Sequence, residues 1–207
     1  MSHKICIKEY SIQIFTLGEF KMNVKGIIFL TGKNAITQVF GTEPWNSFMV
    51  KLAAKDKFFS NIIMSVTPVP LDKFILFLDE LVKEFFNNDM MQYETFGKVA
   101  AQFVLSGDGM YKSYLLIKDK KQIVDSVVPK LWATYFDKGK VDAKFEENVA
   151  HFKVTGLPFK HRYFEYLIMG FVHQALKIYG LKNVPKLIRS MAAGDDDIYC
   201  LCEFKNS

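Results

Sequence analysis

The chain has 207 residues, of which 50% are hydrophobic and 24% are charged. This composition excludes disordered, collagen-like and low-complexity proteins, and the length suits one sizeable hydrophobic core. The 27 basic and 22 acidic residues give a formal net charge of +5, with the lysines scattered among the acids. Because the basic residues form no stripe, we expect no nucleic-acid partner.

Cysteine usage and hydropathy indicate a cytoplasmic protein. Cys6, Cys200 and Cys202 cannot all pair and lack the spacing of a metal-ligand set, which fits a reducing compartment. No run approaches the roughly 18 apolar residues of a membrane span, and the first residues lack the order of a signal peptide. We therefore expect no membrane span and a cytoplasmic location.

Residues 1–21 differ from the rest of the chain because their apolar residues give only a strand-like fragment. The tripeptide Leu17-Gly18-Glu19 is what a purine-rich ribosome-binding site would give if it were translated, so Met22 is a candidate for the natural start. The alternative is an extra N-terminal strand. Both interpretations stay open, and we expect residues 22–207 to form a single α+β domain.

Helical periodicity dominates the first part of the chain. A short helix is predicted from Gly32 to Phe40, and Pro44 is expected to open a second helix. Residues 65–70 are predicted to be extended because their two prolines restrict the backbone. Pro70 then begins a long helix with a wide apolar face. That face is formed by Leu71, Phe74, Ile75, Leu78, Leu81, Val82 and Phe85.

Two further long helices, with a short one near 110–117 between them, are predicted before the chain changes character. Asn87-Asn88-Asp89 precedes the first, in which Gly97 and Ala101 are small enough to allow close contact with another helix. The second covers about residues 120–137, with Pro129 as a kink. The apolar face of the first comprises Tyr93, Phe96, Ala100 and Phe103.

The last third of the chain alternates between apolar and polar residues. A hairpin is predicted after Gly139 with its turn at Glu147-Asn148, and a second strand pair over 184–191 and 197–204. Between these pairs, residues 163–180 form the strongest amphipathic helix, which should cover the sheet. The predicted fold class is therefore α+β, with an N-terminal helical layer followed by a β-β-α-β-β unit whose antiparallel sheet is covered by a long helix.

No catalytic or metal-binding constellation is visible in the sequence. The four histidines form no HExxH motif and no pair at metal spacing, and none has an obvious nucleophile as partner. Cys200 and Cys202 lie two apart on a predicted strand, so both sulfurs face one side; we interpret them as core residues, with a soft-metal pair as the alternative. We therefore expect a protein that is not an enzyme, with no catalytic residue, metal or cofactor.

Several short motifs together carry a family resemblance. They are Val24-Lys25-Gly26, Ser65 to Pro70, the run from Pro129 to Gly139, Gly170 through Gly180, and Gly194-Asp195 followed by Cys200. With these motifs, residues 24–205 resemble an uncharacterised bacterial family of similar length, best known as a large paralogous set in myxobacteria. The C-terminal half also resembles the superfamily of haem-nitric-oxide sensor domains, 4-vinyl reductase domains and TRAPP transport subunits. The resemblance implies an α+β ligand-binding or scaffold domain.

The chain departs from these relatives at their haem and metal sites. Haem sensors of the superfamily use a proximal histidine in the helical part, whereas residues 24–150 contain no histidine. Those sensors hold the haem propionates with Tyr-x-Ser-x-Arg, where this chain has Phe159-Lys160-His161-Arg162. The 4-vinyl reductase type often places a cysteine before its Gly-Asp turn, where Ser190 and Met191 stand in this chain. We therefore expect neither haem nor zinc.

Two functional hypotheses follow. The first is a non-enzymatic sensory domain of bacterial signalling, in which a small apolar ligand lies between the helical layer and the sheet. Aromatic residues are predicted to wall the pocket, because an aromatic body with a polar tip can orient a mostly apolar ligand. These pocket residues are Phe96, Phe103, Trp132, Tyr135 and Phe171. The second hypothesis is an interaction or scaffold module with a filled core, acting through a homodimer or a protein partner.

Overall fold

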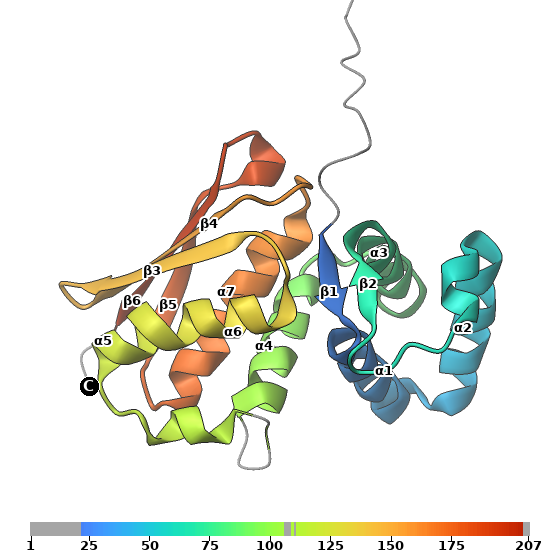
Figure 1. Cartoon of the computed structure of the whole chain (residues 1–207), viewed down its shortest axis with the longest axis horizontal. Coiled ribbons are helices and arrows are strands. Elements are labelled where there is room, and N and C mark those ends of the chain that lie inside the picture. Colours follow the sequence, from blue (N-terminus) through green and yellow to red (C-terminus); the bar gives the residue numbers. More distant parts are fainter. Residues whose placement is uncertain (1–21, 106–108, 110, 205–207) are drawn as a thin grey trace, which may run out of the picture.

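The computed structural model describes residues 22–105, 109 and 111–204. Cys6 and both interpretations of residues 1–21 lie outside the described residues. Figure 1 shows an N-terminal group of helices beside a C-terminal half that is built around a sheet. This arrangement leaves a long boundary between the two parts, and the candidate site lies along it.

Three α-helices form the N-terminal part. α1 (Gly26–Phe40) begins earlier than the predicted start at Gly32 and ends at Gly41, whose φ of 92° favours glycine. α2 (Thr42–Lys55) and α3 (Leu71–Phe86) follow in the order predicted from the apolar spacing. α2 buries Trp45, Phe48 and Leu52, and α3 buries most of its predicted apolar face, with Ile75 and Phe85 half-buried.

A small antiparallel sheet fastens the start of α1 to the start of α3. β1 (Asn23–Lys25) pairs with β2 (Pro68–Pro70), so the second half of the predicted extended segment is a strand. Residues 65 and 66 form a turn instead, because the Thr67 side chain accepts a hydrogen bond from the Met64 N–H at 2.9 Å and its N–H donates to the Met64 carbonyl at 3.0 Å.

Two long helices of the C-terminal half pack closely together. α4 (Gln92–Leu105) runs along α7 (Arg162–Ile178), and glycines on both helices make this possible. A Cβ atom at Gly97 would collide with the Leu167 carbonyl oxygen, and one at Gly170 would collide with the backbone of Glu94. The predicted close contact at Gly97 and Ala101 is therefore confirmed, with α7 as the neighbouring helix.

The helix predicted over 120–137 contains a wide turn. α5 (Lys120–Gln122) runs into a π-helical turn over Ile123–Val127, which continues as α6 (Val128–Tyr135). Pro129 is the second residue of α6, and a proline has no N–H to donate and a ring that crowds the preceding turn. The kink predicted at Pro129 is therefore a π-bulge just before it. Single 3-10 turns elsewhere cover Lys57–Ser60, Lys112–Leu116 and Met191–Ala193.

The antiparallel sheet has the strand order β3-β4-β6-β5. The hairpin turn lies at Glu147 and Asn148 as predicted, and both residues have the positive φ of a two-residue type I′ turn. α7 lies across one face of the sheet (Figure 1), so the predicted α+β fold is confirmed. The strands are β3 (Lys140–Glu146), β4 (Val149–Thr155), β5 (Asn183–Arg189) and β6 (Ile198–Phe204).

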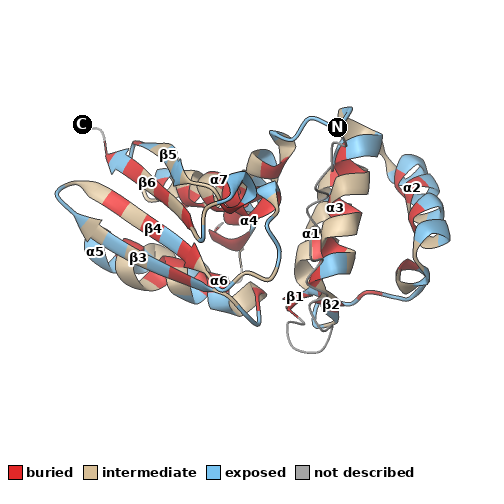
Figure 2. Ribbon diagram, turned by 90° about the horizontal axis from the view of Figure 1, so that it is seen from above, coloured by how far each residue is buried: buried red, intermediate tan, exposed pale blue. Residues whose placement is uncertain are grey.

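One large hydrophobic core extends through both parts of the molecule. Buried residues follow the inner sides of the helices and one face of the sheet (Figure 2). Cys200 and Cys202 belong to this core, paired across the sheet with buried Phe152 and Ala150. Burial raises the pKa of the Cys202 thiol to about 12, so both cysteines behave as small apolar side chains, in line with their interpretation as core residues.

Candidate functional site

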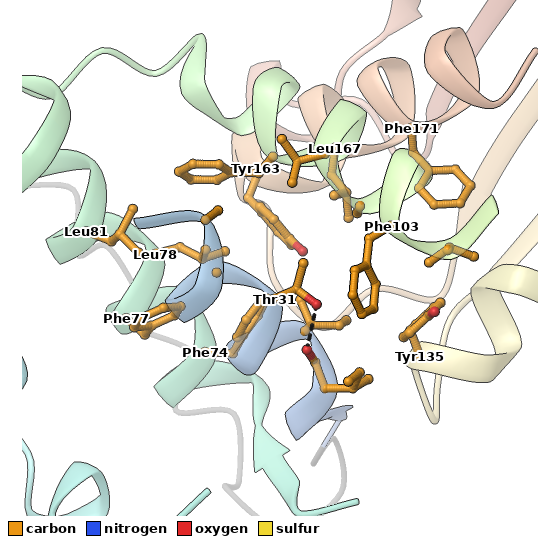
Figure 3. A pocket seen from close by; sticks show the side chains of 18 of the residues that line it. Thr31, Phe74, Phe77, Leu78, Leu81, Phe103, Tyr135, Tyr163, Leu167 and Phe171 are labelled. Carbon is orange, nitrogen blue, oxygen red and sulfur yellow. Dashed lines mark hydrogen bonds between the residues drawn. The ribbon is translucent and has the colours of Figure 1, made fainter. Parts of the chain in front are cut away.

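An apolar cavity of about 110 Å³ lies between the N-terminal helices and the C-terminal half. α1 and α3 form one side, and α4, α6 and α7 form the other (Figure 3). The helical layer and the sheet-bearing half therefore both contribute to the wall. The lining residues are Ile27, Ile28, Thr31, Gly32, Ala35, Ile36, Phe74, Phe77, Leu78, Leu81, Phe96, Val99, Ala100, Phe103, Val104, Tyr135, Phe136, Tyr163, Leu167 and Phe171.

The wall of this cavity is almost entirely hydrocarbon. Three of the described residues that line it carry a hydroxyl: Thr31, Tyr135 and Tyr163. No described lining residue carries a charge, a thiol or an imidazole. The Thr31 hydroxyl donates to the Ile27 carbonyl oxygen at 2.9 Å within α1 (Figure 3). Such a wall suits an uncharged, mostly apolar molecule.

Two tyrosine hydroxyls supply the remaining polarity. Tyr135 Oη is buried and has no hydrogen-bond partner among the described residues. Burial, with a smaller contribution from nearby Tyr111, raises the pKa of Tyr135 well above its ordinary range. Burial also raises the pKa of Tyr163. Both side chains are therefore neutral near pH 7, each with an O–H to donate.

A smaller hollow of about 40 Å³ lies between α6 and α7, next to the cavity. It shares four wall residues with the larger space, namely Tyr135, Phe136, Leu167 and Phe171. The rest of its wall consists of Val128, Leu131, Trp132 and Ile168. Tyr135 thus lies where the two spaces meet.

The five pocket residues predicted from the sequence all lie on these walls. Phe96, Phe103, Tyr135 and Phe171 line the larger cavity, whereas Trp132 lines the smaller hollow and donates its indole N–H to the Lys138 carbonyl at 3.4 Å. The structure brings them together because α4, α6 and α7 converge on the boundary with α1. Their role in ligand binding stays a prediction.

The apolar face predicted for α4 is buried only in part. On the predicted face, Tyr93 is buried, whereas Phe103 is 42% exposed. Small residues let α7 approach the other flank of α4, and this turns the phenylalanines towards the cavity. The buried residues of α4 are Tyr93, Gly97, Ala101, Val104 and Leu105. Phe171 is likewise half-buried and borders both hollows.

The wall formed by the beginning of α1 was not predicted from the sequence. Ile27, Thr31 and Ala35 recur every four residues, which places them on one helix face. That spacing was the available signal, but no capping residue precedes Gly26 to mark a helix start. Tyr163, the first buried residue of α7, was missed because it lies outside the apolar stripe assigned to that helix.

A polar network beside Tyr163 joins three helices. Asp79 of α3 accepts a short hydrogen bond from Tyr93 Oη of α4 and lies 3.3 Å from Nε2 of His161. His161 is the N-cap of α7, and its Nδ1 accepts the Tyr163 N–H at 3.1 Å. Burial on its own raises the pKa of Asp79, but the hydrogen bonds from His161 and Tyr93 outweigh it and hold the pKa below the ordinary 3.8. The start of α7 is therefore tied to α3 at the edge of the cavity.

The other described histidines have partners outside the cavity. Nδ1 of His151 lies 2.7 Å from Tyr199 Oη, and Nδ1 of His173 lies 3.1 Å from Asn183 Oδ1. Over the described ranges, no cluster of His, Cys, Asp or Glu side chains could hold a metal ion. No helix within the same ranges has the length and apolar character to cross a membrane.

Solved structures with a similar fold include H-NOX proteins. The H-NOX protein from S. oneidensis in the Fe(II)NO ligation state has a TM-score of 0.67 and 16% identity, covering 88% of this chain and 99% of its own. The Fe(II) unliganded H-NOX protein from K. algicida has a TM-score of 0.66 and 13% identity, covering 88% and 97%. No family model and no curated protein sequence matches the chain.

The likeness to H-NOX proteins implies a haem, and the side chains of the cavity wall decide whether one could bind there. Its residues include no histidine, cysteine or methionine to ligate iron, and no lysine or arginine to pair with propionates. Tyr135 and Tyr163 are poor substitutes, because their raised pKa values oppose the phenolate that a tyrosine ligand provides. The residues present therefore do not fit a haem. At these identities the likeness shows the fold alone, and the chain has the α+β fold of the H-NOX domains.

Proposed function

We propose that the protein is a non-enzymatic sensory domain that binds a small, uncharged, mostly apolar molecule in the cavity between its two parts. The observation that carries this proposal is the cavity itself, whose hydrocarbon wall is interrupted by three hydroxyls. A wall without a carboxylate, imidazole or thiol offers no pair for acid–base or nucleophilic chemistry. H-NOX proteins of the same fold include one in an Fe(II)NO ligation state, which supports a role in small-molecule sensing.

The size of the two spaces limits the ligand. An engineered apolar cavity of about 150 Å³ takes up benzene. The larger cavity measures about 110 Å³ and the adjoining hollow about 40 Å³. A molecule of roughly benzene size is therefore expected.

The position of the cavity supports a sensory role. A ligand there contacts α1 and α3 on one side and α4 and α7 on the other. A ligand that prefers one relative arrangement of these helices shifts the protein towards it. The Tyr93–Asp79–His161 network connects the same two sides, so it offers a path for such a shift.

One observation favours the second candidate function, an interaction module that acts through a homodimer or a protein partner. Ile62, Met64 and Val66 are 89%, 60% and 77% exposed, which is high for apolar residues of one loop. A filled core, however, was part of that hypothesis, and the apolar cavity argues against it. The ligand-binding proposal therefore explains more of the molecule.

Native mass spectrometry of the full chain, purified gently from its own cells, tests the proposal. Ala100 of α4 lines the cavity, so Ala100→Leu fills part of it, whereas Ala54→Leu adds the same atoms on an exposed position of α2. We expect a retained neutral small molecule in the wild type and in Ala54→Leu, and its loss from Ala100→Leu. Equal retention in all three proteins, or a wild type that retains nothing, would contradict the proposal.

A further inference from the structure

Tyr135 Oη is a buried polar atom that the fold leaves unpaired. Among the described residues, it is the one buried side-chain nitrogen or oxygen atom that has no hydrogen-bond partner. Two other tyrosine hydroxyls are paired: Tyr93 donates to Asp79, and half-buried Tyr179 donates to the Tyr114 carbonyl oxygen at 2.9 Å. Buried hydroxyls without partners are unfavourable and rare in folded proteins, so this one requires an explanation.

The surroundings of Tyr135 place its side chain on the walls of both spaces. The residue is the last of α6, one helical turn after Leu131 and Trp132, which are buried in the same helix. Its ring meets the ring of Tyr111 edge-on, with centroids 6.4 Å apart, and this contact restricts the direction of the side chain. Tyr135 lines both the cavity and the adjoining hollow, so a molecule that occupies either space meets this side chain.

The chemistry of the hydroxyl and of the wall defines the class of ligand. A phenol that keeps its proton donates a hydrogen bond, which calls for an acceptor on the ligand. A carboxylate or phosphate would lose its hydration without gaining a countercharge, because the described wall contains no lysine or arginine. The remaining acceptors of benzene-sized molecules are uncharged atoms, such as the oxygens of ketones, aldehydes and ethers.

We infer that the ligand is a small neutral molecule with one carbonyl or ether oxygen, which accepts a hydrogen bond from Tyr135 Oη, and with an apolar body that fills the larger cavity. This inference rests on the proposed function and narrows it from apolar molecules in general to those with one acceptor. It assigns Tyr135 as a residue that determines specificity.

Titration of the full chain with compounds of matched size tests the inference. Cyclohexanone carries one neutral acceptor, methylcyclohexane carries none, and cyclopentanecarboxylate carries a charge. Ligand-observed NMR gives the dissociation constant of each probe for the wild type and for Tyr135→Phe, which keeps the ring. We expect Tyr135→Phe to weaken cyclohexanone about fivefold, the worth of one hydrogen bond, and to leave methylcyclohexane unchanged. The carboxylate should not bind.

Tyr179→Phe is the matched control, because it removes a hydroxyl that does not line either space. It should leave both neutral probes unchanged. A second measurement serves if Tyr135→Phe fails to fold: the ζ-carbon NMR shift of Tyr135 in the wild type should respond to cyclohexanone and not to methylcyclohexane.

The outcomes separate this inference from the proposed function. If both neutral probes bind the wild type and Tyr135→Phe affects them equally, the inference is wrong and the proposed function stands. Tighter binding of the carboxylate than of cyclohexanone also overturns the inference. If neither neutral probe binds the wild type, the proposed function fails and the inference fails with it.

Discussion

At the residue scale, the unpaired hydroxyl of Tyr135 has a measurable effect on stability. Replacement by phenylalanine removes a buried polar atom that has no partner among the described residues, so we expect Tyr135→Phe to raise the free energy of unfolding by about 1 kcal/mol. Tyr179→Phe removes a hydroxyl that is bonded to the Tyr114 carbonyl and should lower it by about 1 kcal/mol. Urea denaturation of the ligand-free proteins measures both changes. Equal losses in the two variants would show that Tyr135 Oη is paired in solution.

Asp79 predicts the pH dependence at the same scale. Its pKa in the folded protein lies below the ordinary value, because the hydrogen bonds from His161 and Tyr93 outweigh the effect of burial. The associated stability is therefore fully present above about pH 4 and is lost as the pH falls through the folded pKa. We expect the unfolding free energy of the wild type to fall below pH 4 more steeply than that of Asp79→Asn, as measured by urea denaturation across an acid series. The exposed control Asp196→Asn should keep the wild-type slope, and an unchanged slope in Asp79→Asn would disprove the network's contribution.

At the element scale, the contact between α4 and α7 depends on glycine. A Cβ atom at Gly97 would collide with the backbone of α7, which cannot move without displacing the helix. Gly97→Ala should therefore lower the free energy of unfolding by about 1–3 kcal/mol. Gly32→Ala is the control, because its Cβ would lie 3.5 Å from the Phe77 ring and alanine favours helix by about 0.5–1 kcal/mol. Thermal and urea unfolding measure the stability of both variants. Equal changes in the free energy of unfolding would contradict the close contact between α4 and α7 at Gly97.

The position of Phe171 on α7 gives a second prediction for this element. Phe171 borders both hollows, so the native protein already contains empty space beside its ring. Phe171→Ala should therefore lower the free energy of unfolding by less than the loss of about 3–5 kcal/mol that is expected in a filled core. Phe152 on β4 is fully buried, and Phe152→Ala should show the full cost. Equal losses in urea denaturation would favour the filled-core interaction module.

The elements themselves could be predicted where local chemistry decides them. The hairpin follows from alternation and from the tolerance of Asn148 for positive φ, and α7 follows from its apolar spacing. The start of α1 could not be found because Lys25 provides no capping side chain. The π-helical turn before Pro129 could not be predicted, because it depends on how the proline packs against the preceding turn in three dimensions.

Five wall residues of the candidate site could be predicted for a related reason. Large aromatic residues such as Trp132 and Tyr135 reach whatever space lies beside their helix, so composition alone pointed to them. The direction of Phe96 depends on how closely α7 approaches Gly97, which is a tertiary property. The wall from α1 depends on the boundary between the two parts, and no local pattern encodes that boundary.

At the scale of the whole molecule, the fold of haem proteins is combined with a wall that lacks haem ligands. Stoichiometric haemin added to the full chain should give no histidine-ligated Soret band in absorption spectra, because no histidine lines the cavity among the described residues. The described histidines lie on other surfaces or cap α7. A stable Soret band that disappears in His151→Ala, His161→Ala or His173→Ala would contradict this prediction.

The central claim is that the space between the two parts binds a small neutral molecule. Equilibrium urea unfolding with cyclohexanone, in the wild type, Ala100→Leu and Ala54→Leu, tests it most directly. At tenfold excess over the dissociation constant, ligand binding should raise the free energy of unfolding of the wild type and Ala54→Leu by about 1.4 kcal/mol. Ala100→Leu should fold and show no such increase, because leucine occupies the site. The same response in all three proteins, or no response in the wild type, would contradict the claim.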